Sequence, residues 1–222
     1  MCFSKFKLIA VILFTAIFFG ACAQTDAPKT EINTNKKIKS VTNMDNRFDT
    51  ITLGAGCFWC VEAVFQNLKG VEKVTSGYSG GFIKNPAYKE VCMGTTGHAE
   101  VCQVVYNPEI ISLSEILEVF WGTHDPTTLN RQGNDIGTQY RSAIFYHNDE
   151  QKRIAEHYKD ELNKNKVFNN PVITEITAFS NFYPAEDYHQ NYFNLNGDEP
   201  YCQFVIQPKV EKLKKVFKTK LK

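Results

Sequence analysis

Two cysteines three residues apart, Cys57 and Cys60, are the side chains of this sequence best placed to do chemistry. They belong to the stretch Gly-Ala-Gly-Cys-Phe-Trp-Cys at residues 54–60. A β-branched run precedes this stretch, and apolar residues follow it at helical spacing as far as Gly70. The pattern predicts a strand, a tight glycine turn and a helix that begins near Cys57. Free backbone N–H groups and the helix dipole favour an anion there, so we expect Cys57 to ionise more readily than a free cysteine. A small buried cysteine is the alternative interpretation.

A carboxyl group is the second candidate. Residues 98–106 alternate as a strand does, and a period of two places Glu100 on the same face as Cys102 and Val104, which look like core residues. A buried carboxylate is costly unless it is paired. Glu100 is therefore either paired or at an exposed edge, or it has a raised pKa and is held protonated as a proton donor.

The cysteine pair permits other chemistries. A zinc site needs further ligands at close spacing, and only His98 and Cys102 follow, with no second C-x-x-C, so we expect no metal. A general thiol-disulfide oxidoreductase fits a C-x-x-C that opens a helix after a strand. The two aromatic residues between the cysteines, Phe58 and Trp59, favour an apolar pocket beside the thiol over an open exchange site.

The composition favours one folded domain that follows an N-terminal segment. Of 222 residues, 43% are hydrophobic, with 17 Phe and 10 Tyr, which is ample for a core. The net charge of +1 gives no reason to expect nucleic acid as a partner.

Residue patterns predict the elements that must position the candidate side chains. In chain order they are a strand over 71–76, a glycine-rich loop over 77–81, a helix that starts at a capping box of Ser112 and Glu115, a polar loop over 131–137, a strand over 140–147, a helix over 148–165 and a strand over 171–179. Strands follow one another both with and without an intervening helix. We therefore expect an α/β fold of the α+β kind, a two-layer sandwich with a mixed sheet, a ferredoxin-like core and a long irregular C-terminal segment.

Residues 1–23 have the pattern of an export signal: two lysines precede an apolar run too short to span a bilayer comfortably. The run ends either in an A-x-A cleavage site at 21–23 or in a lipobox, which would make 1–21 the signal and leave Cys22 lipidated. The polar stretch 24–47 is typical of a flexible tether and favours the lipobox. A retained anchor helix is the further alternative. We expect an exported bacterial protein, periplasmic or anchored as a lipoprotein, with that lipid as its only membrane contact.

The lysine-rich tail, residues 208–222, has apolar residues at helical spacing. We expect a basic amphipathic helix that docks one face on the domain, and contact with an anionic membrane is the weaker alternative.

Seven motifs are spread along residues 56–190: Gly56-Cys57-Phe58-Trp59, GYSGG at 77–81, YKEVC at 88–92, TGHAE at 96–100, HDPT at 124–127, GNDIGTQYRS at 133–142 and AEDYHQ at 185–190. Together they resemble the peptide methionine sulfoxide reductase A family, over a domain that we assign to residues 48–207. The motifs are long and ordered, so chance agreement is excluded. The paired C-x-x-C zinc signature of the B-type reductase is missing from the sequence, so no fused second module is implied.

The resemblance implies an enzyme that reduces methionine S-sulfoxide, free or within oxidised proteins, and so repairs oxidative damage. It implies that Cys57 is the nucleophile and that Phe58 and Trp59 hold the S-methyl group of the substrate. A thiolate that attacks sulfur pushes charge onto the oxygen, and preplaced donors lower that barrier.

The same resemblance assigns those donors. Glu100 would hydrogen-bond the sulfoxide oxygen and give it a proton, which explains a carboxyl group on an inward face. Tyr88 and Tyr140 would also address this oxygen, and Asp135 would lie nearby.

The resemblance leaves two cysteines to resolve the resulting sulfenic acid of Cys57, because family members use either a cysteine matching Cys202 or the second cysteine of the GCFWC motif, here Cys60. We expect Cys202 to act first, carried on a mobile tail, with Cys60 competing or relaying. Cys92 and Cys102 are expected to be plain loop or core residues. The resulting disulfide would be reduced by an external dithiol, a thioredoxin-like protein, with no bound cofactor, and we expect a monomer.

Overall fold

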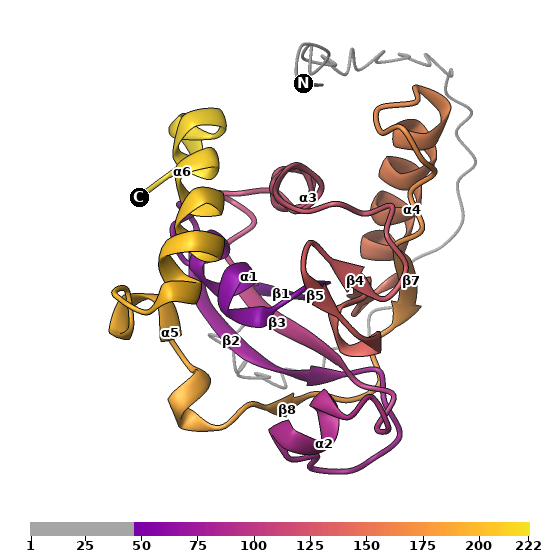
Figure 1. Cartoon of the computed structure of the whole chain (residues 1–222). Coiled ribbons are helices and arrows are strands. Elements are labelled where there is room, and N and C mark those ends of the chain that lie inside the picture. The colour runs from indigo at the N-terminus through magenta and orange to yellow at the C-terminus, as the bar shows by residue number, and fades with distance from the viewer. Residues whose placement is uncertain (1–46) are drawn as a thin grey trace, which may run out of the picture. The chain divides into compact units, whose positions relative to one another are not determined.

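The computed structural model of the protein describes residues 47–222 (Figure 1). The predictions of an export signal, of a lipid on Cys22 and of nearly all of the tether fall on residues 1–46, outside the described part of the chain. Within that part, no helix combines the length and the apolar character needed to cross a membrane.

Six strands form one mixed sheet, in the order β7-β6-β1-β3-β2-β8. Neighbours are antiparallel except β6 and β7, which are parallel. The strands are β1 (Asp49–Ala55), β2 (Val71–Ser79), β3 (Ala99–Tyr106), β6 (Ser142–Tyr146), β7 (Glu175–Ala178) and β8 (Tyr183–Pro184). A separate two-stranded sheet pairs β4 (Arg131–Gln132) with β5 (Asp135–Ile136), inside the predicted polar loop.

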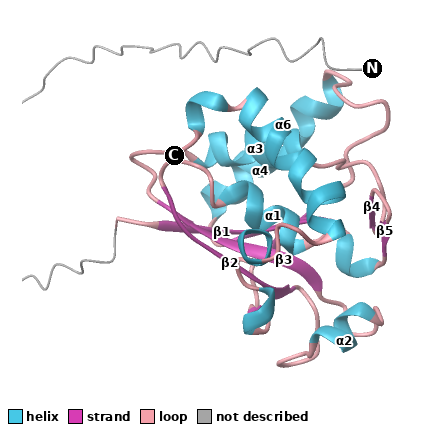
Figure 2. Cartoon of the chain, turned by 60° about the vertical axis from the view of Figure 1, so that its left-hand side comes forward, coloured by secondary structure: helices cyan, strands magenta, loops and turns pink. Residues whose placement is uncertain are grey.

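Helices α1, α3, α4 and α6 lie on one side of the large sheet, and α2 lies apart from them (Figure 2). The helices are α1 (Phe58–Phe65), α2 (Tyr88–Cys92), α3 (Leu113–Thr123), α4 (Asp149–Lys164), α5 (Tyr192–Leu195) and α6 (Gln207–Val216). Short 3-10 turns occupy Thr138–Tyr140, Asp187–His189 and Lys218–Lys220, and a π-helical turn, Cys202–Ile206, runs directly into α6.

The elements β1-α1-β2-β3-α3-β6 give a βαββαβ unit whose strands lie in the order β6-β1-β3-β2. This is the ferredoxin-like arrangement, so the predicted two-layer sandwich with a mixed sheet is confirmed. The unit brings the start of α1 beside the first residues of β3, because β1 and β3 are adjacent and antiparallel. The two main chemical candidates of the sequence therefore meet.

The alternation predicted for β3 is confirmed. Cys102 and Val104 are buried in the large core between sheet and helices, whereas Ala99 and Val101 belong to a smaller cluster on the opposite face. Because a strand has a period of two, Glu100 shares the face of Cys102 and points under the helices.

Local signals set the helix starts as the sequence predicts. The Ser112 hydroxyl accepts the backbone N–H of Glu115 at 3.3 Å, and the Glu115 carboxylate accepts the N–H of Ser112 at 3.0 Å. The tail helix also docks as predicted, since α6 buries Val210 and Leu213. It ends at Val216, earlier than the predicted limit of residue 222.

The glycine-rich loop predicted over 77–81 is wrong for its first half. Residues 77–79 continue β2, because this strand pairs on both sides, Gly77 lying between Val101 of β3 and Pro184 of β8. A Cβ on Gly77 would stand 2.5 Å from the carbonyl oxygen of Tyr183, so the close approach of β8 requires glycine.

Two other predicted strands are too long. Tyr140 ends a 3-10 turn, and the strand begins only at Ser142, where pairing with β1 starts. The strand predicted over 171–179 forms only at β7, where the backbone pairs with β6.

Candidate active site

A glycine turn places Cys57 at the start of α1. Gly56 has φ +89°, and a Cβ there would stand 2.6 Å from the side chain of Gln132, so the turn requires glycine by conformation and by space. Cys57 is the N-cap of α1, and its carbonyl accepts the N–H of Cys60 at 3.1 Å. The strand–turn–helix predicted from the sequence is confirmed.

The state of the two thiols differs from the expectation for Cys57. Cys57 is only 6% exposed, and burial raises its pKa well above the ordinary value, with a further rise from its hydrogen bond to Cys60. The pKa of Cys60 falls to about 7, because Cys57 donates to its sulfur and Lys209 lies beside it. Burial therefore disfavours the thiolate of Cys57, while the lowered pKa favours the thiolate of Cys60. The prediction that Cys57 ionises readily at the helix start is wrong for this state, because desolvation outweighs the helix dipole.

Glu100 faces Cys57 as its register predicts. Its Oε2 accepts the backbone N–H of Phe58 at 3.1 Å, one residue beyond the cysteine. The side chain is 1% exposed, and burial raises the pKa of Glu100 to about 8 despite that hydrogen bond. At neutral pH the carboxyl group is mostly protonated and can donate a proton.

Two phenols join Glu100. Tyr88 begins α2 and Tyr140 ends the 3-10 turn before β6. Burial raises the pKa of both, and the charge of Glu100 adds to each shift, so both hydroxyls remain donors. Asp135, in β5, lies close enough to Glu100 to contribute to its raised pKa. The three residues predicted to address an oxygen therefore lie together, with Asp135 nearby.

The aromatic rings of Phe58 and Trp59, the two residues that follow Cys57, pack against other aromatic side chains. The Phe58 ring packs on Tyr78 and, nearly parallel, on Tyr88, with centroids 5.9 and 6.4 Å away. Trp59 is half-buried and stacks on Tyr192 at 3.7 Å and 7°. These contacts give Phe58 and Trp59 the fixed orientations that an apolar pocket requires.

Two residues that were not predicted as site residues, Tyr201 and His189, contact Cys57 and Trp59. The Tyr201 hydroxyl donates to Asp135 at 2.8 Å and also lies in hydrogen-bond contact with Cys57. The Trp59 indole N–H donates to Nδ1 of His189 at 3.2 Å. The aromatic composition of residues 181–201 was the available signal, since His189 stands in one of the motifs.

Glu186 fixes α2 against the sheet. Its carboxylate accepts the Tyr78 hydroxyl at 2.8 Å and the backbone N–H of Tyr88 at 2.9 Å. It thereby sets the position of the Tyr88 phenol without reaching the thiol itself.

Cys202 does not lie on a mobile tail. It is fully buried in the π-helical turn, because the helix that docks through α6 extends back to it. Cys102 is a core residue as expected, with its thiol donating to the carbonyl of Phe58 at 3.4 Å, and Cys92 is exposed at the end of α2. In the described part of the chain, no cluster of three or more His, Cys, Asp or Glu side chains could hold a metal ion.

The fold and the site define a cysteine-dependent oxidoreductase, with protonated donors facing a buried thiol. The family model described as peptide methionine sulfoxide reductase matches residues 49–221. A peptide methionine sulfoxide reductase MsrA of Trichodesmium erythraeum is 58% identical over 169 residues, covering 76% of this chain and 96% of that protein. The MsrA of Saccharolobus solfataricus is 54% identical, covering 78% and 97%.

Solved structures agree. The reduced form of Mxr1 from Saccharomyces cerevisiae is 37% identical with a TM-score of 0.66, covering 74% of this chain and 94% of that one. The methionine sulfoxide reductase A of Corynebacterium diphtheriae is also 37% identical, with a TM-score of 0.63 and coverage of 69% and 77%. The chain belongs to the peptide methionine sulfoxide reductase family, and its activity is the reduction of methionine sulfoxide.

Proposed function

We propose that this enzyme reduces methionine S-sulfoxide, free and within oxidised proteins, with Cys57 as nucleophile and Glu100 as proton donor. One observation carries the assignment: a carboxyl group that stays protonated near neutrality accepts the N–H of Phe58, directly beside Cys57.

The reaction follows from this arrangement. The Cys57 sulfur attacks the sulfoxide sulfur while the electron pair of the S–O bond moves onto oxygen, which Glu100 protonates. The proton of Cys57 passes to the Glu100 carboxylate that this leaves, so the acid is restored. The Tyr88 and Tyr140 hydroxyls stabilise the developing charge. Oxygen transfers to Cys57 as a sulfenic acid, and methionine leaves reduced by two electrons.

The rings of Phe58 and Trp59 determine which part of the substrate lies beside Cys57. Phe58 and Trp59 bind the S-methyl group, which has no polar atom to satisfy, while the donors lie on the side of Glu100. A sulfoxide is chiral at sulfur, so a site that fixes both the methyl group and the oxygen accepts one epimer.

The positions of Cys60 and Cys202 indicate which thiol attacks the sulfenic acid of Cys57 first. The Cys60 side chain already hydrogen-bonds Cys57. Cys202 is buried in the π-helical turn before α6 and interacts electrostatically with Cys60. This geometry favours Cys60 as the first resolving thiol and Cys202 as the next member of a relay, the reverse of the order expected from the sequence. The order stays a prediction until the disulfides are mapped.

The remaining assignments follow from chemistry and from the N-terminal sequence. A disulfide at the site requires an external dithiol, and a thioredoxin-like protein supplies one. The signal pattern of residues 1–23 supports export, with Cys22 as the site of a lipid.

The test uses the full chain with dithiothreitol and a peptide that carries one methionine sulfoxide epimer at a time. We expect turnover of the S epimer alone, lost in Cys57→Ser and retained in Cys92→Ser, which alters an exposed cysteine. Insulin reduction without sulfoxide turnover would instead support a general disulfide oxidoreductase built on Cys57 and Cys60, and turnover of both epimers equally would contradict the proposed geometry.

A further inference from the structure

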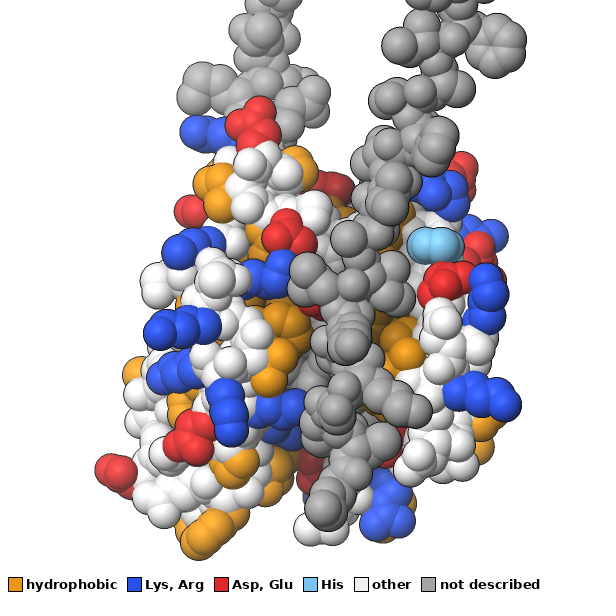
Figure 3. Space-filling model, turned by 90° about the horizontal axis from the view of Figure 1, so that it is seen from above, with side chains coloured by type: hydrophobic (Ala, Val, Ile, Leu, Met, Phe, Trp, Pro, Cys, Tyr) orange, Lys and Arg blue, Asp and Glu red, His pale blue; other side chains and the backbone are white. Residues whose placement is uncertain are grey.

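The C-terminal helix α6 is rich in lysine. Figure 3 shows Lys and Arg side chains on both flanks of the molecule, and on α6 Lys214 and Lys215 are exposed. Lys209 differs: it is half-buried in the first turn of α6, seven residues after Cys202 on the same continuous helix, and its side chain points toward α1.

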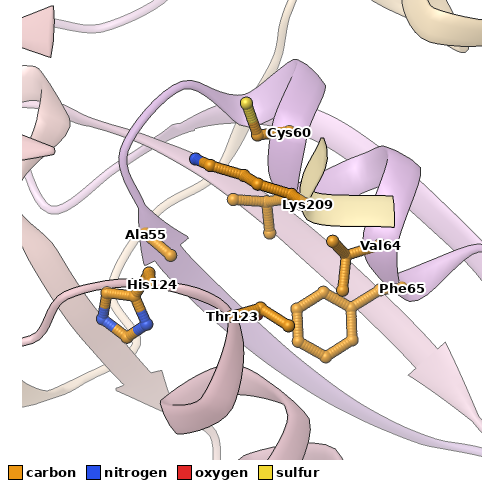
Figure 4. Close-up of a pocket in the computed structure, with 8 residues that line it drawn as sticks. Ala55, Cys60, Val64, Phe65, Thr123, His124 and Lys209 are labelled. Atoms are coloured by element: carbon orange, nitrogen blue, oxygen red, sulfur yellow. The ribbon is translucent and has the colours of Figure 1, made fainter. Parts of the chain in front are cut away.

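Lys209 reaches Cys60. Both side chains line a small pocket between α1, the end of α3 and α6 (Figure 4), and the Lys209 ammonium forms a hydrogen bond with the Cys60 sulfur. The same pocket is otherwise lined by apolar side chains, by Thr123 and by His124. Because few water molecules fit in this pocket, the attraction between the Lys209 ammonium and a Cys60 thiolate is stronger than it would be at the surface.

No carboxylate competes for this lysine. Among the ion pairs of the described residues, none involves Lys209. The largest influences on Cys57 are its burial and the neighbouring Cys60, Glu100 and Tyr201, whereas Lys209 is among the main influences on Cys60. The positive charge of Lys209 thus favours the thiolate of Cys60.

The other ionisable groups near Cys60 come from every element packed around it. They are Cys57 of α1, Glu100 and Cys102 of β3, His124 at the end of α3, Tyr201 and Cys202 at the π-helical turn, and Lys209 and its neighbour Lys212 on α6. Burial lowers the pKa of His124 to about 4, so this imidazole is neutral. Glu100 is protonated near neutrality, which leaves Lys209 as the cation in contact with Cys60.

We propose that Lys209 is a positioning residue for disulfide formation, which holds Cys60 as the thiolate that attacks oxidised Cys57. This inference rests on the proposed function. In the step, the Cys60 thiolate attacks the sulfenic sulfur of Cys57, the S–S bond forms and the S–OH bond breaks. Hydroxide leaves and takes a proton from Glu100 or solvent to become water. The Cys60 sulfur supplies the electron pair of the new S–S bond, and its formal oxidation state rises from −2 to −1 while that of the Cys57 sulfur falls from 0 to −1.

The experiment separates the two chemical steps in the full chain. Reduced enzyme is mixed with one equivalent of a methionine S-sulfoxide peptide and no reductant, then quenched at intervals across the pH range in which thiols titrate. Methionine formed reports the first step, and the Cys57–Cys60 disulfide, counted by mass spectrometry, reports the second. The ultraviolet absorbance of thiolate is titrated in parallel without substrate.

In Lys209→Met we expect unchanged methionine formation, disulfide formation slowed about tenfold at neutral pH, and a pH midpoint raised by roughly one unit. The thiolate titration should move by the same amount. Lys209→Arg should restore most of the rate, and Lys215→Met, which removes a similar charge from the exposed face of α6, should behave as wild type.

A Lys209→Met enzyme with wild-type thiolate titration and wild-type disulfide formation would overturn the inference while leaving the proposed function intact. Failure of the wild-type chain to form methionine would overturn the proposed function, and the thiolate titration would then still decide whether Lys209 acts on Cys60.

Discussion

The two cysteines of one helical turn lie in opposite surroundings. Cys57 faces a neutral set of donors, namely a protonated carboxyl group and phenols, and its pKa is raised. Cys60, three residues on, faces a lysine and has a lowered pKa. The difference shows how one turn of α1 can serve two steps. The groups near Cys57 supply protons to the sulfoxide oxygen, and Lys209 near Cys60 favours the thiolate that forms the disulfide.

The largest expected effect comes from the donor side. Glu100→Gln keeps the shape and the hydrogen bond to the N–H of Phe58 but cannot give up a proton. We expect the rate of methionine formation to fall about a thousandfold at neutral pH. A loss below about tenfold would show that the tyrosines alone supply the proton.

The same carboxyl group makes a pH prediction for stability. The pKa of Glu100 is raised in the folded protein, so the native state keeps a proton that the unfolded chain releases. Wild-type stability therefore falls as pH rises from the value for a free glutamate through about 8, where the shift is complete. Urea unfolding of Glu100→Gln against wild type should show a growing advantage for the variant over that window, and parallel curves would argue against a buried proton.

On the thiolate side, Cys60→Ser should leave the first turnover intact. With a thioredoxin-like reductant we expect steady-state turnover to fall about a hundredfold, because the thiol in contact with Cys57 is gone. Cys202→Ser should have the smaller effect. Normal recycling in Cys60→Ser, with arrest in Cys202→Ser, would restore the order expected from the sequence.

A smaller effect on turnover is expected from Tyr201. Tyr201 contacts Cys57 and donates to Asp135, so Tyr201→Phe removes a polar partner without opening a cavity. We expect kcat to fall about tenfold with little change in KM, as for one lost hydrogen bond to a charged group. Equal changes in both constants would point to a binding role instead.

The smallest effect is expected at the pocket wall. Tyr192→Leu removes the ring stacked on Trp59 and should raise KM about threefold to tenfold, the usual value of an aromatic pair. Tyr188→Leu is the matched control, since Tyr188 is exposed and does not stack on Trp59. An unchanged KM in Tyr192→Leu would show that Trp59 keeps its orientation through His189 alone.

The comparison also shows what the sequence could reveal. The glycine turn, the helix start at Cys57 and the inward face of Glu100 depend on local spacing, and all three were predictable. The charge on Cys60 depends on Lys209, and the orientation of Trp59 depends on His189, 130 positions away. Neither contact has a local signal. Cys202 was misplaced for a related reason, because its burial follows from the docking of α6 and not from residues next to it.

In this mechanism a neutral carboxyl group beside Cys57 gives up its proton, and infrared spectroscopy can observe that group directly. A Glu100→Gln minus wild-type difference spectrum should contain the carbonyl stretch of one protonated carboxylic acid at neutral pH, which titrates away near pH 8. Absence of this band at neutral pH, with carboxylate bands in its place, would show that Glu100 is ionised and is not the proton donor.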